Sequence, residues 1–402
     1  MIHIYNKTQS KITTIIAAFN AGSRIEKKQG FNAGISHMLE HCIFKGTEKR
    51  DTKQIIEDIS MLGGYTNAFT SHEMVAYYIE VPYNNLEPAL EILSDIVLNS
   101  TIPDEEFKKE REVVLEEEAS SYDSVNGQMY KAYRDNFHKG YLSTPVIGTK
   151  ESINNFTTEE VRRFYKTNCT KDNLIVSVSS NYTKKYSLPL IEKYFGKPTG
   201  RVKKPQSFKP IKTYKNLGLT HEMTYPNIEH TYVWVSFPSL VKKDKRNVHL
   251  RVLSQILGGG MDSRLFREVR EKRGLVYSIG CSNSASEQQG SFGVSFSCRD
   301  KNVDEVLKII NEEVIRISQE EIDDKELIKV KNKSITAYYS AVEDSHTMTM
   351  NPIMKKMFRT PTIDEYSKLL EATSKADVQS VAKDIFKETP FILICRREGE
   401  SK

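Results

Sequence analysis

The sequence predicts an α+β protein of two homologous domains, each a mostly antiparallel sheet with helices packed on it. A chain of 402 residues is too long for one ordinary core. Its 38% hydrophobic and 28% charged residues are typical of a soluble globular protein. The order of strands and helices expected in the first half recurs in the second half, which favours two copies of one domain.

The first half alternates β-branched apolar runs with stretches of helical periodicity. Residues 12–19 (ITTIIAAF) are typical of a central strand. Two short runs on either side of a polar turn predict a hairpin. We expect strands at 12–19, 65–70, 74–81 and 173–179, and helices at 35–45, 52–62, 86–98, 104–120 and 158–165.

A change of composition separates the two halves. Residues 199–216 are rich in Lys, Pro and Thr and show no periodicity, so we predict a linker between domains 1–198 and 217–402. In the second domain we expect strands at 230–237, within 275–298 and at 391–396, and helices at 248–257, 303–317, 320–340 and 378–386. Residues 86–90 align with 303–307 and residues 102–107 with 322–327, shifts of 303 − 86 = 217 and 322 − 102 = 220.

The expected helix at 35–45 carries the clearest chemical pattern. His37, Glu40 and His41 stand at i, i+3 and i+4 and therefore share one side. The opposite side is apolar and available for packing, with Ile35, Met38, Leu39, Cys42 and Ile43. Imidazoles suit zinc, and the order H-x-x-E-H is that of the inverzincins. The alternative is a polar, solvated helix face.

The second copy lacks this pattern. The helix expected at 248–257 has Leu, Arg, Val, Leu, Ser and Gln where the first copy has its His and Glu residues. Side chains with a structural role would be expected in both copies. Their presence in one copy fits a catalytic role carried by one domain.

A third ligand is expected from the acidic helix at 104–120. For most of its glutamates the simple interpretation is a solvated face. Glu110 and Glu117 stand two turns apart, on a face that also carries Phe107, Val113 and Val114. A carboxylate on an apolar stripe needs a partner, and zinc is one. We therefore expect Glu117 to bind the metal and Glu110 to support a ligand.

The chain at this point resembles the insulinase/pitrilysin family of zinc peptidases, in particular its shorter branch of the mitochondrial-processing-peptidase type. Members have an HxxEH helix, a ligand Glu about 76 residues beyond the second His and another Glu one heptad earlier. Here 117 − 41 = 76 and 117 − 110 = 7. The resemblance implies one zinc ion per chain, held by His37, His41 and Glu117. It implies that Glu40 is the general base, which takes a proton from zinc-bound water and passes it to the leaving amine.

The resemblance also assigns substrate-binding segments. Residues 64–70 look like the family's edge strand, which takes up substrate as an added β-strand, and this implies contacts from Asn67, Ala68 and Phe69. The alternative is an ordinary hairpin strand. Residues 258–266, Arg270 and Tyr277 match the family's second signature, whose Arg and Tyr hydrogen-bond the substrate and polarise the scissile carbonyl. The alternative is a surface Arg and a core Tyr.

The main functional hypothesis is a zinc endopeptidase that acts on peptides or unfolded segments. By the resemblance, each chain forms half of a clamp-like chamber and pairs with itself or with a relative that lacks the zinc motif. General peptide turnover and maturation of a leader-bearing peptide both fit. A second hypothesis is a non-catalytic binding or partner subunit of the same fold. A lyase with the same metal motif is excluded, since that enzyme is one short domain with a Cys ligand.

Composition narrows the partners and the location. The net charge of +5 is small, and the basic residues of the chain are scattered among acidic ones. This argues against nucleic acid as the main binding partner. Five widely spaced Cys residues without a C-x-x-C pair are typical of reduced thiols. There is no signal-peptide pattern at the N-terminus and no apolar run long enough for a bilayer, so we expect a cytoplasmic protein with no membrane partner.

Overall fold

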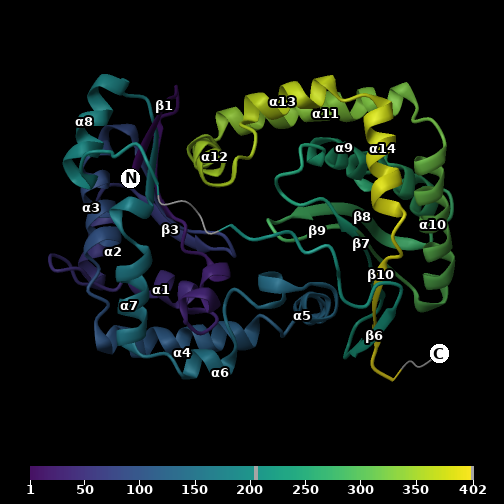
Figure 1. Cartoon of the computed structure of the whole chain (residues 1–402), viewed down its shortest axis with the longest axis horizontal. Helices are drawn as coiled ribbons and strands as arrows, with labels where there is room; N and C mark the ends of the chain where they lie inside the picture. The colour runs from purple at the N-terminus through teal and green to yellow at the C-terminus, as the bar shows by residue number, and fades with distance from the viewer. Residues whose placement is uncertain (203–206, 400–402) are drawn as a thin grey trace. The chain divides into compact units, whose positions relative to one another are not determined.

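The computed structural model describes residues 1–202 and 207–399, which form two compact units (Figure 1). Unit 1 takes its described residues from 1–121, 144–202 and 339–362. Unit 2 takes its described residues from 122–143, 207–338 and 363–399. Each unit contains a five-stranded sheet with helices packed on it, which confirms the predicted fold class.

The sheet of unit 1 has the strand order β1-β5-β2-β4-β3 and is mostly antiparallel. Only β1 and β5 pair in parallel among its neighbours. Its strands are β1 (Ile2–Lys7), β2 (Ile12–Phe19), β3 (Tyr65–Thr70), β4 (Val75–Pro82) and β5 (Leu174–Ser180). β2 is central and buried along seven of its eight residues, as its β-branched sequence predicts, while β3 lies at an edge of the sheet.

Seven helices cover one face of this sheet and share one core. They are α1 (Ile35–Ile43), α2 (Thr52–Met61), α3 (Leu86–Asn99), α4 (Asp104–Ser120), α6 (Lys150–Asn154), α7 (Thr158–Asn168) and α8 (Lys184–Phe195). The strand residues that face them alternate with residues of the opposite face, as in Ile15, Ala17 and Phe19.

A buried carboxylate fixes the start of α1. Both oxygens of Glu26 accept backbone hydrogen bonds, from Gly34 N–H at 3.0 Å and Ser36 N–H at 2.9 Å. Burial raises the pKa of Glu26 to about 7, although these hydrogen bonds favour the carboxylate. Gly34 has φ 93°, and a Cβ there would lie 2.4 Å from the backbone oxygen of Ile147. The chain therefore enters α1 along one tightly constrained path.

The sheet of unit 2 repeats this plan with the order β6-β10-β7-β9-β8. Its strands are β6 (Thr220–Tyr225), β7 (Thr231–Ser239), β8 (Val276–Ala285), β9 (Gly290–Cys298) and β10 (Phe391–Arg397). β6 and β10 pair in parallel, and the other neighbours are antiparallel. One face packs on α9 (Asn247–Gly258), α10 (Val303–Gln319), α11 (Asp324–Glu343), α13 (Ile363–Ala372) and α14 (Lys375–Phe386).

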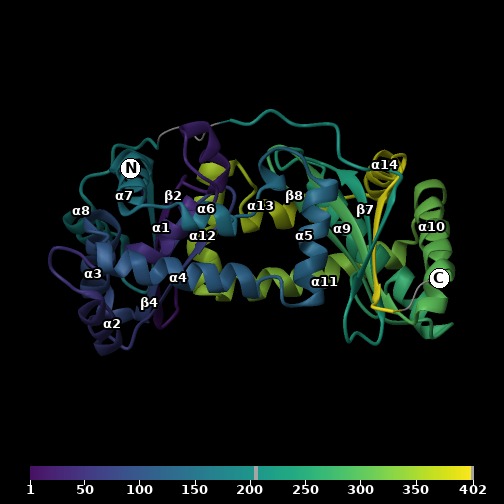
Figure 2. The same cartoon turned by 90° about the horizontal axis from the view of Figure 1, so that it is seen from below.

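Each unit is completed by a helix from the other half of the sequence. α5 (Val125–Phe137) packs on the second sheet through Met129 and Phe137, and α12 (Ser345–Phe358) packs on the first sheet through Ile353 and Met357. In Figures 1 and 2, α5 lies on the face of the second sheet opposite α14, and α12 lies on the face of the first sheet opposite α3. The shift 345 − 125 = 220 equals the shift between 102 and 322, so α5 and α12 are counterparts in the duplication.

The sequence predicted most elements to within a few residues and missed a particular group: β1, α5, α6, α8, β6, α12 and α13. Both α8 and α12 contain an internal proline, Pro189 and Pro352, which argues against a helix in a single sequence. Within the predicted linker, residues 203–206 lie outside the described residues, and 199–202 and 207–216 form no helix or strand. The domain boundaries at 198 and 217 stay a prediction. The two compact units of the structure are each made of several separate segments of the chain.

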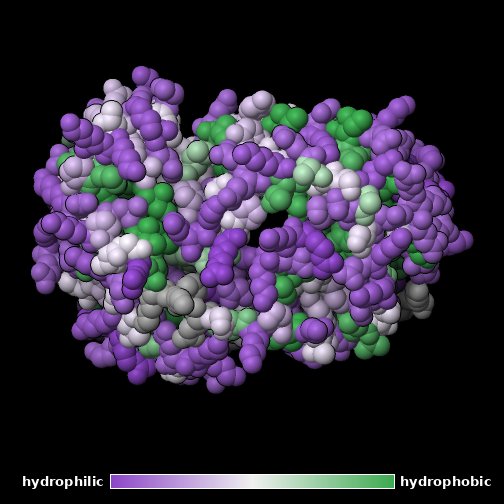
Figure 3. Space-filling view, turned by 45° about the horizontal axis from the view of Figure 1, so that its top comes forward, coloured by the Kyte–Doolittle hydropathy of each residue, from purple (hydrophilic) through white to green (hydrophobic). Residues whose placement is uncertain are grey.

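On the face seen in Figure 3 hydrophilic residues predominate, with hydrophobic residues in small groups among them. In the described part of the chain, no helix combines the length and apolarity needed to cross a membrane.

We expect Ile353→Ala to destabilise unit 1, because Ile353 is fully buried between α12 and the first sheet. Removing a buried Ile side chain costs about 2–5 kcal/mol. Urea unfolding followed by far-UV circular dichroism measures the loss. Ile335→Ala on α11, where the side chain is 40% exposed, is the matched control and should leave the curve almost unchanged. Equal stability of the two variants would contradict the packing of α12 on the sheet.

Candidate metal centre

Helix α1 buries one face and presents the other to α4. Its core-facing residues match the predicted apolar side: Ile35, Met38, Leu39, Cys42 and Ile43 are all buried. The His37 and His41 side chains are 12% and 20% exposed, and their ring centroids lie 4.7 Å apart. The rings therefore stand side by side on a helix that the core holds in place.

Helix α4 brings the predicted third ligand to these imidazoles. Glu117 Oε1 lies 3.8 Å from His37 Nε2, and Glu117 Oε2 lies 3.3 Å from His41 Nε2. A ligand atom from each of the three residues lies within 4.8 Å of the others. The structure thus brings together residues 76 positions apart in sequence.

The reason given for Glu117 from the sequence is wrong in one respect. Phe107, Glu110 and Val114 are buried as expected, but Val113 is 49% exposed and the Glu117 side chain is 48% exposed. At about 100° per residue, Val113 lies roughly 120° around the helix from Phe107, outside the buried stripe. Glu117 is at the open end of this stripe, so its contacts with the imidazoles, and not deep burial, distinguish it.

Glu110 links the metal centre to a lysine that the sequence did not single out. Glu110 Oε2 lies 3.2 Å from His41 Nδ1, and Lys45 Nζ lies 2.7 Å from Glu110 Oε1. The imidazole therefore uses Nδ1 for the carboxylate and directs Nε2 toward Glu117. This is the arrangement that fixes the orientation of a metal-binding histidine.

The protonation states of these side chains depend on one another. Burial, with the neighbouring His41, lowers the pKa of His37 to about 4. Burial also disfavours protonated His41, but hydrogen bonds to Glu110 and Glu117 and the charges of Glu117 and Glu40 raise its pKa to about 9. The hydrogen bond from His41 is the main cause that lowers the pKa of Glu117. At neutral pH His37 is thus neutral and His41 protonated, and a metal ion would replace a proton of His41.

This donor set fits zinc. Two imidazole nitrogens and one carboxylate oxygen are a zinc-enzyme ligand set, and such ligands around one tetrahedral ion lie roughly 3.4 Å from one another. Glu117 approaches the two imidazoles with different oxygens, at 3.8 Å and 3.3 Å, and one ligand atom from each of the three residues lies within 4.8 Å of the others. Among the described residues, His37 Nδ1 is buried without a hydrogen-bond partner.

Glu40 lies on the same side of α1 and is held by β3. Thr70 Oγ1 donates a hydrogen bond to Glu40 Oε2 at 2.6 Å. Burial raises the pKa of Glu40, and the hydrogen bond from Thr70 opposes that rise. The sequence did not predict Thr70 as a site residue, although the alternation of β3 places it on the same face as Ala68.

The three predicted substrate-binding residues lie on the edge strand β3. Ala68 packs on the core that contains α1, whereas Phe69 packs on the opposite face with α12. Asn67 is exposed, donates to Tyr65 OH at 2.8 Å and accepts from Ala68 N–H at 2.8 Å. β3 therefore presents an edge beside the helix that carries His37, Glu40 and His41.

Arg270 and Tyr277 lie together in unit 2. Arg270 is on a π-helical turn (Phe266–Glu271), a feature frequent at functional sites, and Tyr277 is on the edge strand β8. Arg270 Nη1 donates to the backbone oxygen of Tyr277, and the guanidinium lies 5.8 Å from the Tyr277 ring centroid. Tyr277 is 70% exposed, so it is not the core residue of the alternative interpretation. His230, not noticed in the sequence, lies beside it with 5.9 Å between ring centroids.

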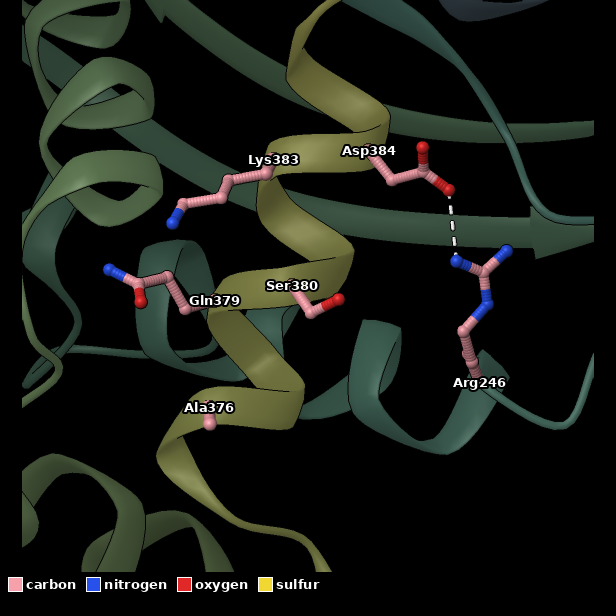
Figure 4. Close-up of a pocket in the computed structure, with 6 residues that line it drawn as sticks. All are labelled: Arg246, Ala376, Gln379, Ser380, Lys383 and Asp384. Carbon is pink, nitrogen blue, oxygen red and sulfur yellow. Dashed lines mark hydrogen bonds and ion pairs between the residues drawn. The ribbon is translucent and has the colours of Figure 1, made fainter.

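An open pocket along α14 in unit 2 contains none of the predicted site residues. It is lined by Arg246, Ala376, Gln379, Ser380, Lys383 and Asp384 (Figure 4). Arg246 Nη1 donates to Asp384 Oδ2 at 2.9 Å, and Asp244 accepts two further hydrogen bonds from the guanidinium. The charge of the Arg246 guanidinium is therefore already balanced by the carboxylates of Asp244 and Asp384.

Known proteins resemble this chain over most of its length. An uncharacterized zinc protease of Streptomyces coelicolor is 31% identical over 90% of this chain and 80% of its own length. The uncharacterized zinc protease YmxG of Bacillus subtilis is 30% identical over 91% of this chain and 89% of its own length. A solved protease from Helicobacter pylori has the same fold, with a TM-score of 0.84, 21% identity and coverage of 98% of this chain and 96% of that one.

Two family models match different parts of the chain. Residues 1–150, which contain His37, His41 and Glu117, match the model described as insulinase (peptidase family M16). Residues 155–334, which contain Arg270 and Tyr277, match the model described as peptidase M16 inactive domain. The chain therefore belongs to the insulinase family, peptidase family M16.

Proposed function

We propose that the chain is a zinc-dependent endopeptidase that cleaves peptides or unfolded segments. The observation that carries this proposal is the convergence of His37, His41 and Glu117 with Glu40 on the same helix face. Relatives of about 30% identity that are named zinc proteases support it. The "inactive" description applies to a model that matches residues 155–334, outside the metal centre.

His37, His41 and Glu117 would hold the ion, and Glu110 orients His41. Zinc, when bound, polarises a carbonyl and lowers the pKa of water. Glu40 accepts a proton from the attacking water and delivers it to the amine nitrogen that leaves. Thr70 keeps one Glu40 oxygen fixed, so the other oxygen is available for this transfer.

The substrate would bind as an extended strand along β3. An edge strand offers unpaired backbone groups, and a peptide that pairs with them is positioned through its main chain whatever its sequence. Contacts from Asn67, Ala68 and Phe69 would then align the scissile bond with Glu40. By the family resemblance, Arg270 and Tyr277 would bind the substrate backbone and polarise the scissile carbonyl.

We further propose that the active form is a dimer that encloses its substrate, each chain supplying half of a chamber. The partner would be a second copy or a related chain. The chain carries both the zinc set and the Arg270/Tyr277 pair, so a homodimer would be sufficient. A cytoplasmic location is proposed because all five cysteines are free and a reducing compartment keeps them so.

Glu40→Gln tests the reaction. The substitution removes the proton acceptor and leaves the ligands, so zinc content should be unchanged while cleavage of a fluorogenic peptide falls about 10²–10⁴-fold. A peptide that co-purifies with the inactive variant, identified by mass spectrometry, would name the substrate. Glu57→Gln on α2, 54% exposed, is the control. Full cleavage by the Glu40 variant would refute this mechanism, and a zinc-free, inert wild-type chain would favour a non-catalytic subunit.

Glu117→Gln tests the metal centre itself. Replacing a charged ligand by an amide should reduce bound zinc, measured by plasma mass spectrometry after dialysis against a chelator, well below one ion per chain. Glu116→Gln, one residue away on the exposed side of α4, should keep the ion. Equal zinc content in both variants would remove Glu117 from the ligand set.

Thr70→Val tests the support of the general base. A hydrogen bond to a charged group contributes about 1.5–3 kcal/mol, so kcat should fall roughly ten- to a hundredfold with little change in KM. Thr70→Ser keeps the hydroxyl and should restore most of the rate. If the Ser and Val variants have the same kcat, the hydroxyl does not position Glu40.

A further inference from the structure

We propose that Lys45 is a positioning residue of the metal centre, which acts through Glu110 on the ligand His41. The inference rests on the proposed zinc binding and extends it to a residue outside the ligand set. It identifies the interaction that holds Glu110 in the orientation His41 requires.

The contacts form one continuous chain. Lys45 Nζ lies 2.7 Å from Glu110 Oε1, and the other oxygen of the same carboxylate lies 3.2 Å from His41 Nδ1. Lys45 follows His41 by four residues, just beyond the end of α1 at Ile43, while Glu110 is on α4. The Glu110 carboxylate from α4 is thus shared between His41 on α1 and Lys45 in the turn that follows α1.

Burial makes this shared contact strong. The Glu110 side chain is 11% exposed and the Lys45 side chain 24% exposed, so the pair is poorly screened by water. A buried carboxylate without a cation is costly and would turn toward solvent or another donor. With Lys45 on Oε1, Oε2 remains directed at His41 Nδ1, and Nε2 is left facing Glu117.

The backbone of Lys45 has separate partners. Its N–H donates to the Cys42 oxygen at 3.1 Å, and its carbonyl accepts from Thr52 Oγ1 at 3.0 Å. These bonds hold the turn after α1 and do not involve the ammonium group. A change of the Lys45 side chain therefore tests the contact to Glu110 and leaves the turn intact.

The experiment measures the zinc dissociation constant of the full chain by competition with a chromophoric chelator. Loss of a group that supports a ligand typically weakens metal binding by about 10–100-fold. We expect a loss of this size in Lys45→Met and recovery in Lys45→Arg, whose guanidinium can also bind a carboxylate. Lys49→Met, 64% exposed on the following loop, is the control and should bind zinc like the wild type.

The same substitution in a Glu110→Gln background separates positioning from general stability. There Lys45→Met should cause no further loss of zinc affinity, because its route to His41 is already removed. Thermal unfolding of the metal-free variants checks folding, and Lys45→Gln, which keeps a donor without the charge, replaces Lys45→Met if that variant does not fold. Wild-type affinity in Lys45→Met, or an equal loss in both backgrounds, would overturn this inference alone. A wild-type chain that binds no zinc would overturn the proposed function as well.

Discussion

The burial of one face of α1 against the first sheet is the constraint on which the candidate site depends. Nine residues of helix place five apolar side chains in the core, and the helical repeat then leaves His37, Glu40 and His41 on the other side. Glu26 and Gly34 fix where the helix starts, which sets the rotation of the whole segment. A shift of one residue would turn the imidazoles by about 100° and remove them from Glu117.

A second layer of contacts completes this arrangement with groups from three elements. α4 supplies Glu110 and Glu117, β3 supplies Thr70, and the turn after α1 supplies Lys45. Glu110 contacts His41 Nδ1 and Lys45, Glu117 contacts both imidazoles, and Thr70 donates to one oxygen of Glu40. The result is a set of residues whose directions are determined before any ligand binds, which is the condition for efficient catalysis by electrostatic means.

The sequence was sufficient for the elements with clear periodicity and for the helix that carries His37, Glu40 and His41, because spacing in a helix determines which residues share a side. A heptad spacing and a family resemblance predicted Glu117 as a ligand. The exposure of the Glu117 side chain was not predicted, because it depends on where α4 leaves the core. Thr70 and Lys45 were missed because an ordinary hydroxyl or ammonium becomes informative only when a partner distant in sequence lies beside it. The helices α8 and α12 were missed because an internal proline in each argues against a helix in the sequence alone. In the folded chain, packing on a sheet stabilises the helical conformation.

The reciprocal placement of α5 and α12 bears on how the duplication arose. The two helices are counterparts, and each covers a sheet built from the other repeat. An ancestral single repeat would have carried such a helix without using it on its own sheet. A pair of such repeats that exchanged helices, as domain-swapped dimers do, would bury both faces of each sheet. Fusion of the two genes would then have preserved, within one polypeptide, an interface that first existed between molecules.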